Sequence, residues 1–159
     1  VARDISEEED NLEIVYEQEK VYNGIEQTFI VSSVKLSGII LVKDVDYTVS
    51  NNTAKDVLAD GSYYLEINGI NDYTGSINLV FNINPFTANL SWSEVEDLVY
   101  DKTAKVVTAS VNNLFGEDVC QVTALLTENN DNINVGSFTF TATALSNPNY
   151  KLADNVTSP

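Results

Sequence analysis

The sequence predicts an all-β protein built from two small β-rich modules in tandem. Hydrophobic residues alternate with polar ones along much of the chain, and short motifs occur twice, 75 to 78 residues apart. Alternation with a period of two places one face of a strand toward a core and the other toward water. Repetition at a nearly fixed spacing indicates that one structural unit occurs twice.

Residues 1–10 come first, and we expect them to be an acidic leader. Residues 7–10 read Glu-Glu-Glu-Asp, the densest block of charge in the chain. Blocks of like charge repel one another and stay solvated. We therefore expect a solvated, frayed or linker-like segment here, with a calcium site or a site for a basic partner as the alternative.

Residues 11–85 are expected to form the first module. The residues expected in its core share the inward-facing phase of their strands: Leu12, Ile14, Leu65, Ile67, Leu79, Phe81 and Ile83. One stretch, residues 53–60, has helical character, because Thr53 offers an N-cap and Gly61 a stop. At eight residues, it would form two turns at most.

Residues 86–159 are expected to form the second module, joined to the first near Pro85, since proline suits a strand end or a short linker. The residues expected in its core are Leu90, Trp92, Val122, Ala124, Phe138 and Phe140. We expect each module to be a small sandwich or an open sheet of five or six strands. The alternative is a β-grasp sheet crossed by one short helix at residues 53–60.

Four pairs of motifs define the correspondence between the modules. In order, they are Asn11-Leu12 and Asn89-Leu90, Val21-Tyr22 and Val99-Tyr100, Gly61-Ser62-Tyr63 and Gly136-Ser137-Phe138, and Asn71-Asp72-Tyr73 and Pro148-Asn149-Tyr150. The spacing drifts by only three residues, which small deletions in loops explain.

Composition excludes several classes of function. The chain has 24 acidic residues against 8 basic ones, a net charge of -16, so nucleic acid and anionic membrane surfaces are poor partners. It has no histidine, which excludes Ser-His-Asp triads and histidine-ligated metals. Because 43% of the residues are hydrophobic, the chain can bury a core despite its acidity. We expect no enzymatic activity, no catalytic residues and no cofactor.

Cys120 is the single cysteine, so the chain cannot form an internal disulfide. It shares the phase of Val122 and Ala124 on an alternating strand, which predicts a buried, unreactive thiol. The apolar stretches are far shorter than a membrane span, and we expect no membrane insertion by this chain.

Residues 128–134 are the best calcium candidate, because oxygen-bearing side chains recur through them. The glycine and glutamate that complete an EF-hand loop are missing, so we expect a plain loop. Glu94 and Glu96 lie too close in sequence for a glycosidase pair. The triplets that begin at Asn51, Asn89 and Asn155 match glycosylation sequons, which are frequent by chance in an asparagine-rich chain.

Aromatic residues are the remaining candidates for a ligand site. Tyr22 and Tyr100 occur at equivalent places in the two copies, as do Tyr73 and Tyr150, which favours turn-anchoring rings over sugar-binding platforms. Trp92 stands where the first copy has Ile14, which indicates a core or inter-module position, with carbohydrate stacking as the alternative.

The motifs of the first copy resemble the MBG-type modules of bacterial surface proteins. The residues that carry the resemblance are Val21-Tyr22-Asn23-Gly24, Asp46-Tyr47-Thr48-Val49, Asp72-Tyr73-Thr74-Gly75-Ser76 and Phe81-Asn82-Ile83. The second copy is similar to the related YDG variety, through Val99-Tyr100-Asp101, Gly136-Ser137-Phe138-Thr139 and Asn149-Tyr150-Lys151-Leu152. The resemblance implies tandem extracellular modules that act as stalk or adhesion units without catalysis.

Together these observations predict a stalk or spacer of a secreted or cell-surface bacterial protein, with neighbouring repeats of the same chain as its partners. The alternative is an adhesin module that binds a host or cell-surface glycan or protein. We also expect a piece of a longer protein, because residues 155–159 are typical of a join between domains.

Overall fold

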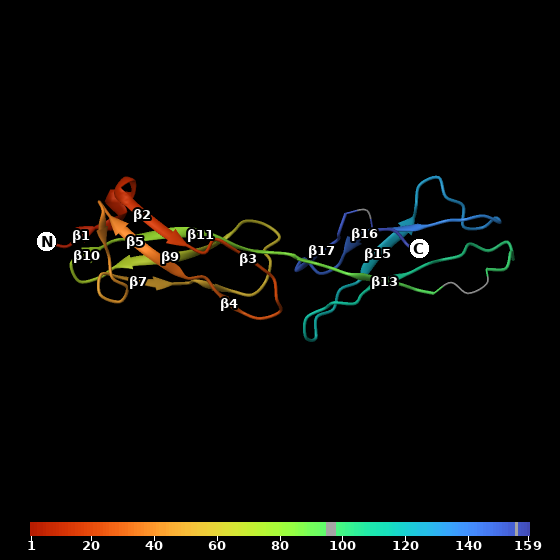
Figure 1. Cartoon of the computed structure of the whole chain (residues 1–159), viewed down its shortest axis with the longest axis horizontal. Coiled ribbons are helices and arrows are strands. Elements are labelled where there is room, and N and C mark those ends of the chain that lie inside the picture. Colours follow the sequence, from red (N-terminus) through yellow and green to blue (C-terminus); the bar gives the residue numbers. More distant parts are fainter. Residues whose placement is uncertain (95–97, 155) are drawn as a thin grey trace. The chain divides into compact units, whose positions relative to one another are not determined.

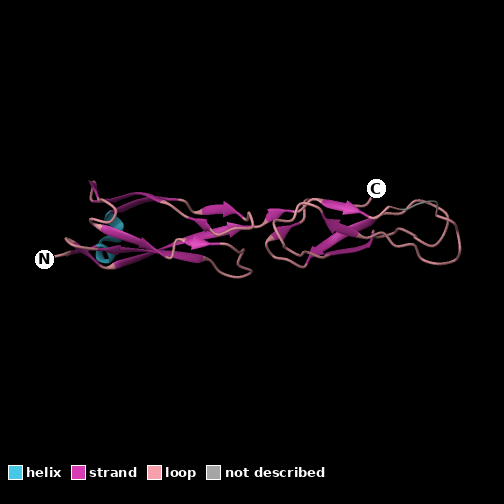
Figure 2. Cartoon of the chain, turned by 90° about the horizontal axis from the view of Figure 1, so that it is seen from below, coloured by secondary structure: helices cyan, strands magenta, loops and turns pink. Residues whose placement is uncertain are grey.

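The computed structural model describes residues 1–94, 98–154 and 156–159, and these residues form short strands joined by turns and loops (Figure 1, Figure 2). The one helix among them is a 3-10 helix, η1, at Ile5–Asn11. The prediction of an all-β fold is confirmed. The chain divides into two compact units, Val1–Asn84 and Pro85–Pro159.

Unit 1 contains two main sheets. Its strands are β1 (Arg3–Asp4), β2 (Leu12–Tyr16), β3 (Glu19–Val21), β4 (Gln27–Thr28), β5 (Val31–Leu36), β6 (Ile39–Ile40), β7 (Tyr47–Ser50), β8 (Thr53–Ala54), β9 (Tyr63–Gly69), β10 (Tyr73–Thr74) and β11 (Ser76–Asn84). One sheet has the order β3-β11-β9-β7 and the other the order β2-β5-β6, while β1 pairs with β10 and β4 with β8. The unit is therefore sandwich-like.

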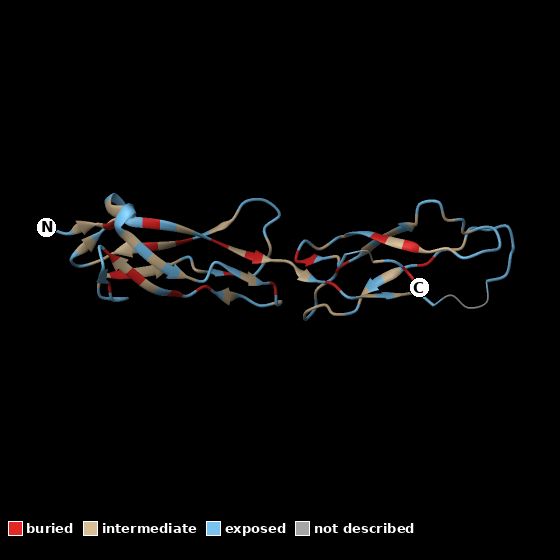
Figure 3. Ribbon diagram, turned by 45° about the horizontal axis from the view of Figure 1, so that its top comes forward, coloured by how far each residue is buried: buried red, intermediate tan, exposed pale blue. Residues whose placement is uncertain are grey.

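The core of unit 1 takes residues from both sheets, and Figure 3 marks the buried stretches in red. Val34 and Leu36 on β5 are buried, as are Leu65 and Ile67 on β9. They alternate with more exposed neighbours, because successive side chains of a strand point to opposite faces. Removing their apolar surface from water supplies the main driving force for this unit to fold.

Unit 2 is built from shorter ladders. Its strands are β12 (Phe86–Thr87), β13 (Leu90–Trp92), β14 (Ala109–Val111), β15 (Val122–Leu126), β16 (Phe140–Leu145) and β17 (Tyr150–Lys151). They pair as β12 with β17, β13 with β14 and β15 with β16. Its buried hydrophobic residues are Ala88, Val107, Cys120, Phe140, Ala142 and Tyr150.

Three strand pairings of unit 1 recur in unit 2 in the same order. A parallel pair joins β1 to β10 and again β12 to β17, with Tyr73 and Tyr150 at equivalent places. Antiparallel pairs join β2 to β5 and β13 to β14, in which Leu12 and Leu90 are equivalent. The β7–β9 and β15–β16 pairs complete the series. The pairings therefore agree with the duplicated motifs of the sequence.

The expectation that residues 1–10 are a solvated leader is wrong. Arg3 and Asp4 pair with β10, and Ile5 is fully buried. The side chain of Asp4 caps η1 by accepting a hydrogen bond of 2.9 Å from the Ser6 backbone, and the Arg3 guanidinium forms an ion pair with Glu8. The isoleucine anchors the segment, and the ion pair offsets part of the acidic repulsion.

The helix expected at residues 53–60 is also wrong, and with it the β-grasp alternative. Thr53 and Ala54 form β8, which pairs with β4, and the side chain of Ala54 is buried. The Tyr63 hydroxyl donates a hydrogen bond of 2.7 Å to the Asp56 carbonyl, within the bends that follow. Threonine and glycine mark turns as well as helix ends, so the cap signals were ambiguous.

The core prediction has the correct strand phase but overstates burial. Of the expected core residues, those that are buried are Leu65, Ile67, Phe81, Ile83 and Phe140. The half-buried ones are Leu12, Ile14, Leu79, Leu90, Trp92, Val122, Ala124 and Phe138. Edge strands and two-stranded ladders leave such side chains partly open to water. The sequence-based list omitted Ile5, Tyr22, Phe29, Val34 and Leu36, all buried.

Candidate functional site

Unit 2 has a shallow groove lined largely by apolar side chains. Its apolar lining consists of Leu98, Val99, Tyr100, Ile133, Val135 and Phe138. Val135 is 91% exposed and Val99 72% exposed, although both are apolar. We call this surface the unit 2 groove.

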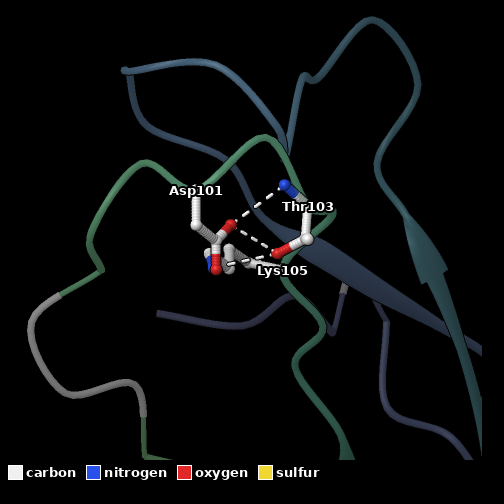
Figure 4. A network of polar contacts seen from close by, with 3 residues as sticks. All are labelled: Asp101, Thr103 and Lys105. Atoms are coloured by element: carbon white, nitrogen blue, oxygen red, sulfur yellow. Dashed lines mark hydrogen bonds and ion pairs between the residues drawn. The ribbon is translucent and has the colours of Figure 1, made fainter.

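Lys105 also lines the groove, within a small polar network (Figure 4). Its ammonium donates a hydrogen bond of 2.7 Å to Oδ2 of Asp101, while Oδ1 accepts one of 2.9 Å from the Thr103 backbone. The Lys105 ammonium, followed by Thr103, lowers the pKa of the Asp101 carboxyl. The network therefore fixes the turn at residues 101–105. It also pairs the positive charge of Lys105, beside the groove, with the carboxylate of Asp101.

Asn132 anchors the other side of the groove. Its carbonyl accepts a hydrogen bond of 2.9 Å from the Lys105 backbone, and its side-chain amide donates one of 2.7 Å to the Lys105 carbonyl. Asn52 makes the same two contacts with Phe29 in unit 1, at 2.7 and 2.9 Å. These two asparagine clamps were missed by sequence reasoning, because asparagines are too frequent in this chain to single them out.

Unit 1 has a second open surface, between β2 and β11. It is lined by Glu9, Leu12, Ile14, Tyr16, Ile77, Asn78 and Leu79. The Tyr16 hydroxyl donates a hydrogen bond of 2.8 Å to the Val80 carbonyl and so ties β2 to β11. Burial raises the pKa of this phenol. Most of the side chains that line this surface are apolar.

The calcium candidate at residues 128–134 is a hydrogen-bonded loop. Oδ1 of Asp131 accepts hydrogen bonds from the backbones of Ile133 and Asn134, at 2.8 and 3.1 Å. Oδ1 of Asn130 accepts one of 2.8 Å from the Thr139 backbone. These oxygens already hold the loop together. Within residues 1–94, 98–154 and 156–159, no three His, Cys, Asp or Glu side chains gather closely enough to hold a metal ion.

The other residues singled out in the sequence are scattered. Cys120 is buried, as expected, and Trp92 is half-buried on β13. The turn-anchoring role expected of Tyr150 agrees with its hydroxyl, which accepts a hydrogen bond of 2.8 Å from the Phe115 backbone. Glu96 and Asn155 lie outside the described residues.

Tyr22 and Tyr100 differ in environment. Tyr22 is 1% exposed and Tyr100 52% exposed, although the sequence places them equivalently. The Tyr22 backbone donates a hydrogen bond of 2.8 Å to the Asn84 carbonyl at the end of β11. Tyr100 instead lines the unit 2 groove. The two tyrosines therefore do not share one structural role.

Comparisons with known proteins add no relative. No family model, no curated protein and no solved structure matches the chain. In the part of the chain that the structure describes, no helix is long and apolar enough to cross a membrane.

Proposed function

We propose that the chain consists of non-catalytic tandem modules of a bacterial cell-surface or secreted protein, where they serve as a stalk or spacer in adhesion. The observation that carries this proposal is that three strand pairings occur in the same order in both units, which join directly at Asn84 and Pro85. Tandem repeated units hold the segments of a protein that precede and follow them apart from each other. The MBG-type motifs support the extracellular location.

The charge of the chain supports a spacer role as well. With 24 acidic and 8 basic residues, neighbouring stalks repel one another and stay soluble. The hydrogen bonds described above, such as those of Asp131 and Asn132, hold loops in place. On this proposal the partners are neighbouring repeats of the same chain, and nucleic acid is not among them.

A second candidate is a glycan- or protein-binding adhesin module. The exposed ring of Tyr100 beside Phe138 in the unit 2 groove favours it, because sugars stack on aromatic rings. An adhesin module would bind one ligand saturably, whereas a spacer would not.

The experiment that separates the two candidates is a glycan array together with capture of purified host surface proteins by the whole chain. A spacer gives no saturable binding at micromolar concentration. Saturable binding that Tyr100→Ala weakens at least tenfold would establish the adhesin candidate instead. Tyr64→Ala is the matched control, because Tyr64 is equally exposed, at 59%, on β9 of unit 1.

A further inference from the structure

In unit 1, the second half of β11 completes the core. The Phe81 ring lies 4.3 Å from the Phe29 ring and 5.4 Å from the Tyr63 ring, measured between centroids. Ile83, two residues further along, is 4% exposed. Both side chains point inward because they share one phase of the strand.

This half of β11 is held by strands on both sides. Antiparallel pairing with β9 places Leu79 opposite Leu65 and Phe81 opposite Tyr63. Parallel pairing with β3 places Asn84 opposite Val21. The central position of β11 therefore explains why β3 is a strand and why Tyr22, which follows it, is buried.

In unit 2, residues 156–158 hold the first positions of the equivalent strand. Thr157 forms an antiparallel bridge with Thr141, and the Ser158 backbone donates a hydrogen bond of 2.8 Å to the Phe140 carbonyl. Ser158 thus lies opposite Phe140, as Leu79 lies opposite Leu65. In this register, a residue two positions after Ser158 would lie opposite Phe138, as Phe81 lies opposite Tyr63.

The residues around that place are counterparts of those that hold Phe81. Phe138 corresponds to Tyr63 through the duplicated motif, and Lys105 corresponds to Phe29 through the asparagine clamps. Both line the unit 2 groove. The groove therefore occupies the place that Phe81 fills in unit 1.

The neighbouring backbone agrees with this assignment. Residues 98–100 lie outside any strand, whereas their counterparts in unit 1 include the end of β3. Leu98 is 49% exposed and Tyr100 is 52% exposed. A strand in the β11 position would pair with residues 98–100 and cover both side chains.

We propose that the unit 2 groove is the acceptor of an added β-strand. The occupant is an extended segment joined directly to Pro159, with one large apolar residue immediately after Pro159 and a second two positions later. Residues 156–158 already set its register, and β11 shows the chemistry that fits, an aromatic residue followed by a branched aliphatic one. Main-chain hydrogen bonds hold such a strand, and pockets for alternate side chains select it.

The test extends the full chain after Pro159 by Phe-Asn-Ile-Asn, the sequence of residues 81–84. Thermal unfolding is followed by the fluorescence of Trp92, the single tryptophan, which reports on unit 2. We expect the melting temperature of unit 2 to rise by about 5 °C or more. We also expect slower hydrogen exchange in the amides of residues 98–100, because they would gain ladder hydrogen bonds.

Two further extensions are matched controls. Ser-Asn-Ser-Asn keeps the length and removes the apolar groups, while Asn-Phe-Asn-Ile keeps the apolar groups but shifts them to the other face of the strand. Neither is expected to change melting or exchange. An unchanged melting temperature with Phe-Asn-Ile-Asn would overturn the proposal, as would an equal rise with all three extensions. A parent chain that is dimeric in solution and unaffected by the extension would also overturn it, because a second copy would then fill the groove.

Discussion

The hydroxyl of Tyr150 donates a hydrogen bond of 2.7 Å to Oδ2 of Asp118, which lies 32 residues earlier in unit 2. The Tyr150 hydroxyl oxygen also accepts a hydrogen bond of 2.8 Å from the Phe115 backbone. The Tyr150 ring is 4% exposed, so this phenol ties the loop at residues 115–118 to β17 from within the core. Burial raises the pKa of the phenol, which stays protonated as a donor.

Tyr150→Phe removes both hydrogen bonds and keeps the ring. We expect it to lower the free energy of unfolding of unit 2 by about 1–3 kcal/mol, because a buried polar contact is lost and its partners are left behind. Urea unfolding followed by Trp92 fluorescence measures the change. Tyr100→Phe, at an exposed tyrosine of the same unit, should change it by less than about 0.5 kcal/mol. Equal effects would show that the hydroxyl of Tyr150 has no structural role.

Ile5→Ala tests whether residues 1–10 belong to unit 1. Ile5, the first residue of η1, is fully buried, so the smaller side chain leaves a cavity. We expect a loss of about 2–4 kcal/mol from unit 1, measured by calorimetry, with the Trp92 transition of unit 2 unchanged. Ile40→Ala is the control, because Ile40 is 67% exposed. A loss of stability no larger than that of the control would support the original expectation that residues 1–10 form a solvated leader.

Gly75→Ala tests the contact between Asp4 and the turn before β11. Gly75 has a φ of +82°, and a Cβ there would collide with the Asp4 carboxylate that caps η1. Gly38 has a φ of +80° with no atom within 4 Å of such a Cβ. Both substitutions incur backbone strain of about 1–2 kcal/mol. We expect Gly75→Ala to destabilise unit 1 clearly more than Gly38→Ala in calorimetry, and equal losses would exclude the Asp4 contact as the cause.

Asn132→Asp tests the asparagine clamp of unit 2. The substitution replaces the amide that donates to the Lys105 carbonyl with a carboxylate that repels it. We expect unit 2 to lose about 1–3 kcal/mol of stability in urea unfolding. Asn129→Asp adds the same charge at an exposed residue with a φ of +64°, which aspartate tolerates, and should have little effect. If both variants lose the same stability, added charge explains the loss and the clamp does not.

Acid should destabilise unit 2 partly through Asp101. The pKa of its carboxyl is lowered, first by Lys105 and then by Thr103, so its contribution is present above the pKa of about 3.9 in the unfolded chain. That contribution is lost as the pH falls through the lower pKa of the folded state. We expect Asp101→Asn to flatten the fall in Trp92-detected melting temperature below pH 4, more so at low salt. Glu117→Gln, at an exposed carboxylate, is the control, and an identical acid limb in both variants would contradict this linkage.

The sequence predicted strands best where buried apolar residues alternate regularly with polar or exposed ones. Leu65 and Ile67 alternate with polar or exposed neighbours on β9, and both are buried as expected. The helix predicted at residues 53–60 was wrong because threonine and glycine mark turns as well as helix ends. Ile5 was hidden within an acidic run, and only its packing in unit 1 shows that it is a core residue.

The candidate site was less predictable, because it depends on pairing between distant residues. Tyr22 and Tyr100 look alike in sequence, yet the burial of Tyr22 depends on β11, whose last residue is Asn84. The strand-acceptor role proposed for the unit 2 groove could be inferred only from the register that places Ser158 opposite Phe140. No local pattern in the sequence carries that information.

The most direct measurement of a spacer role is adhesion by bacteria that display the chain between a cell-surface anchor and a nanobody head. With the head present, we expect binding to a ligand recessed in a surface coat to increase when the chain is doubled. With the head removed, we expect adhesion no higher than that of cells without the chain. Adhesion by the headless chain to uncoated host cells, or no gain from doubling it, would contradict the spacer role.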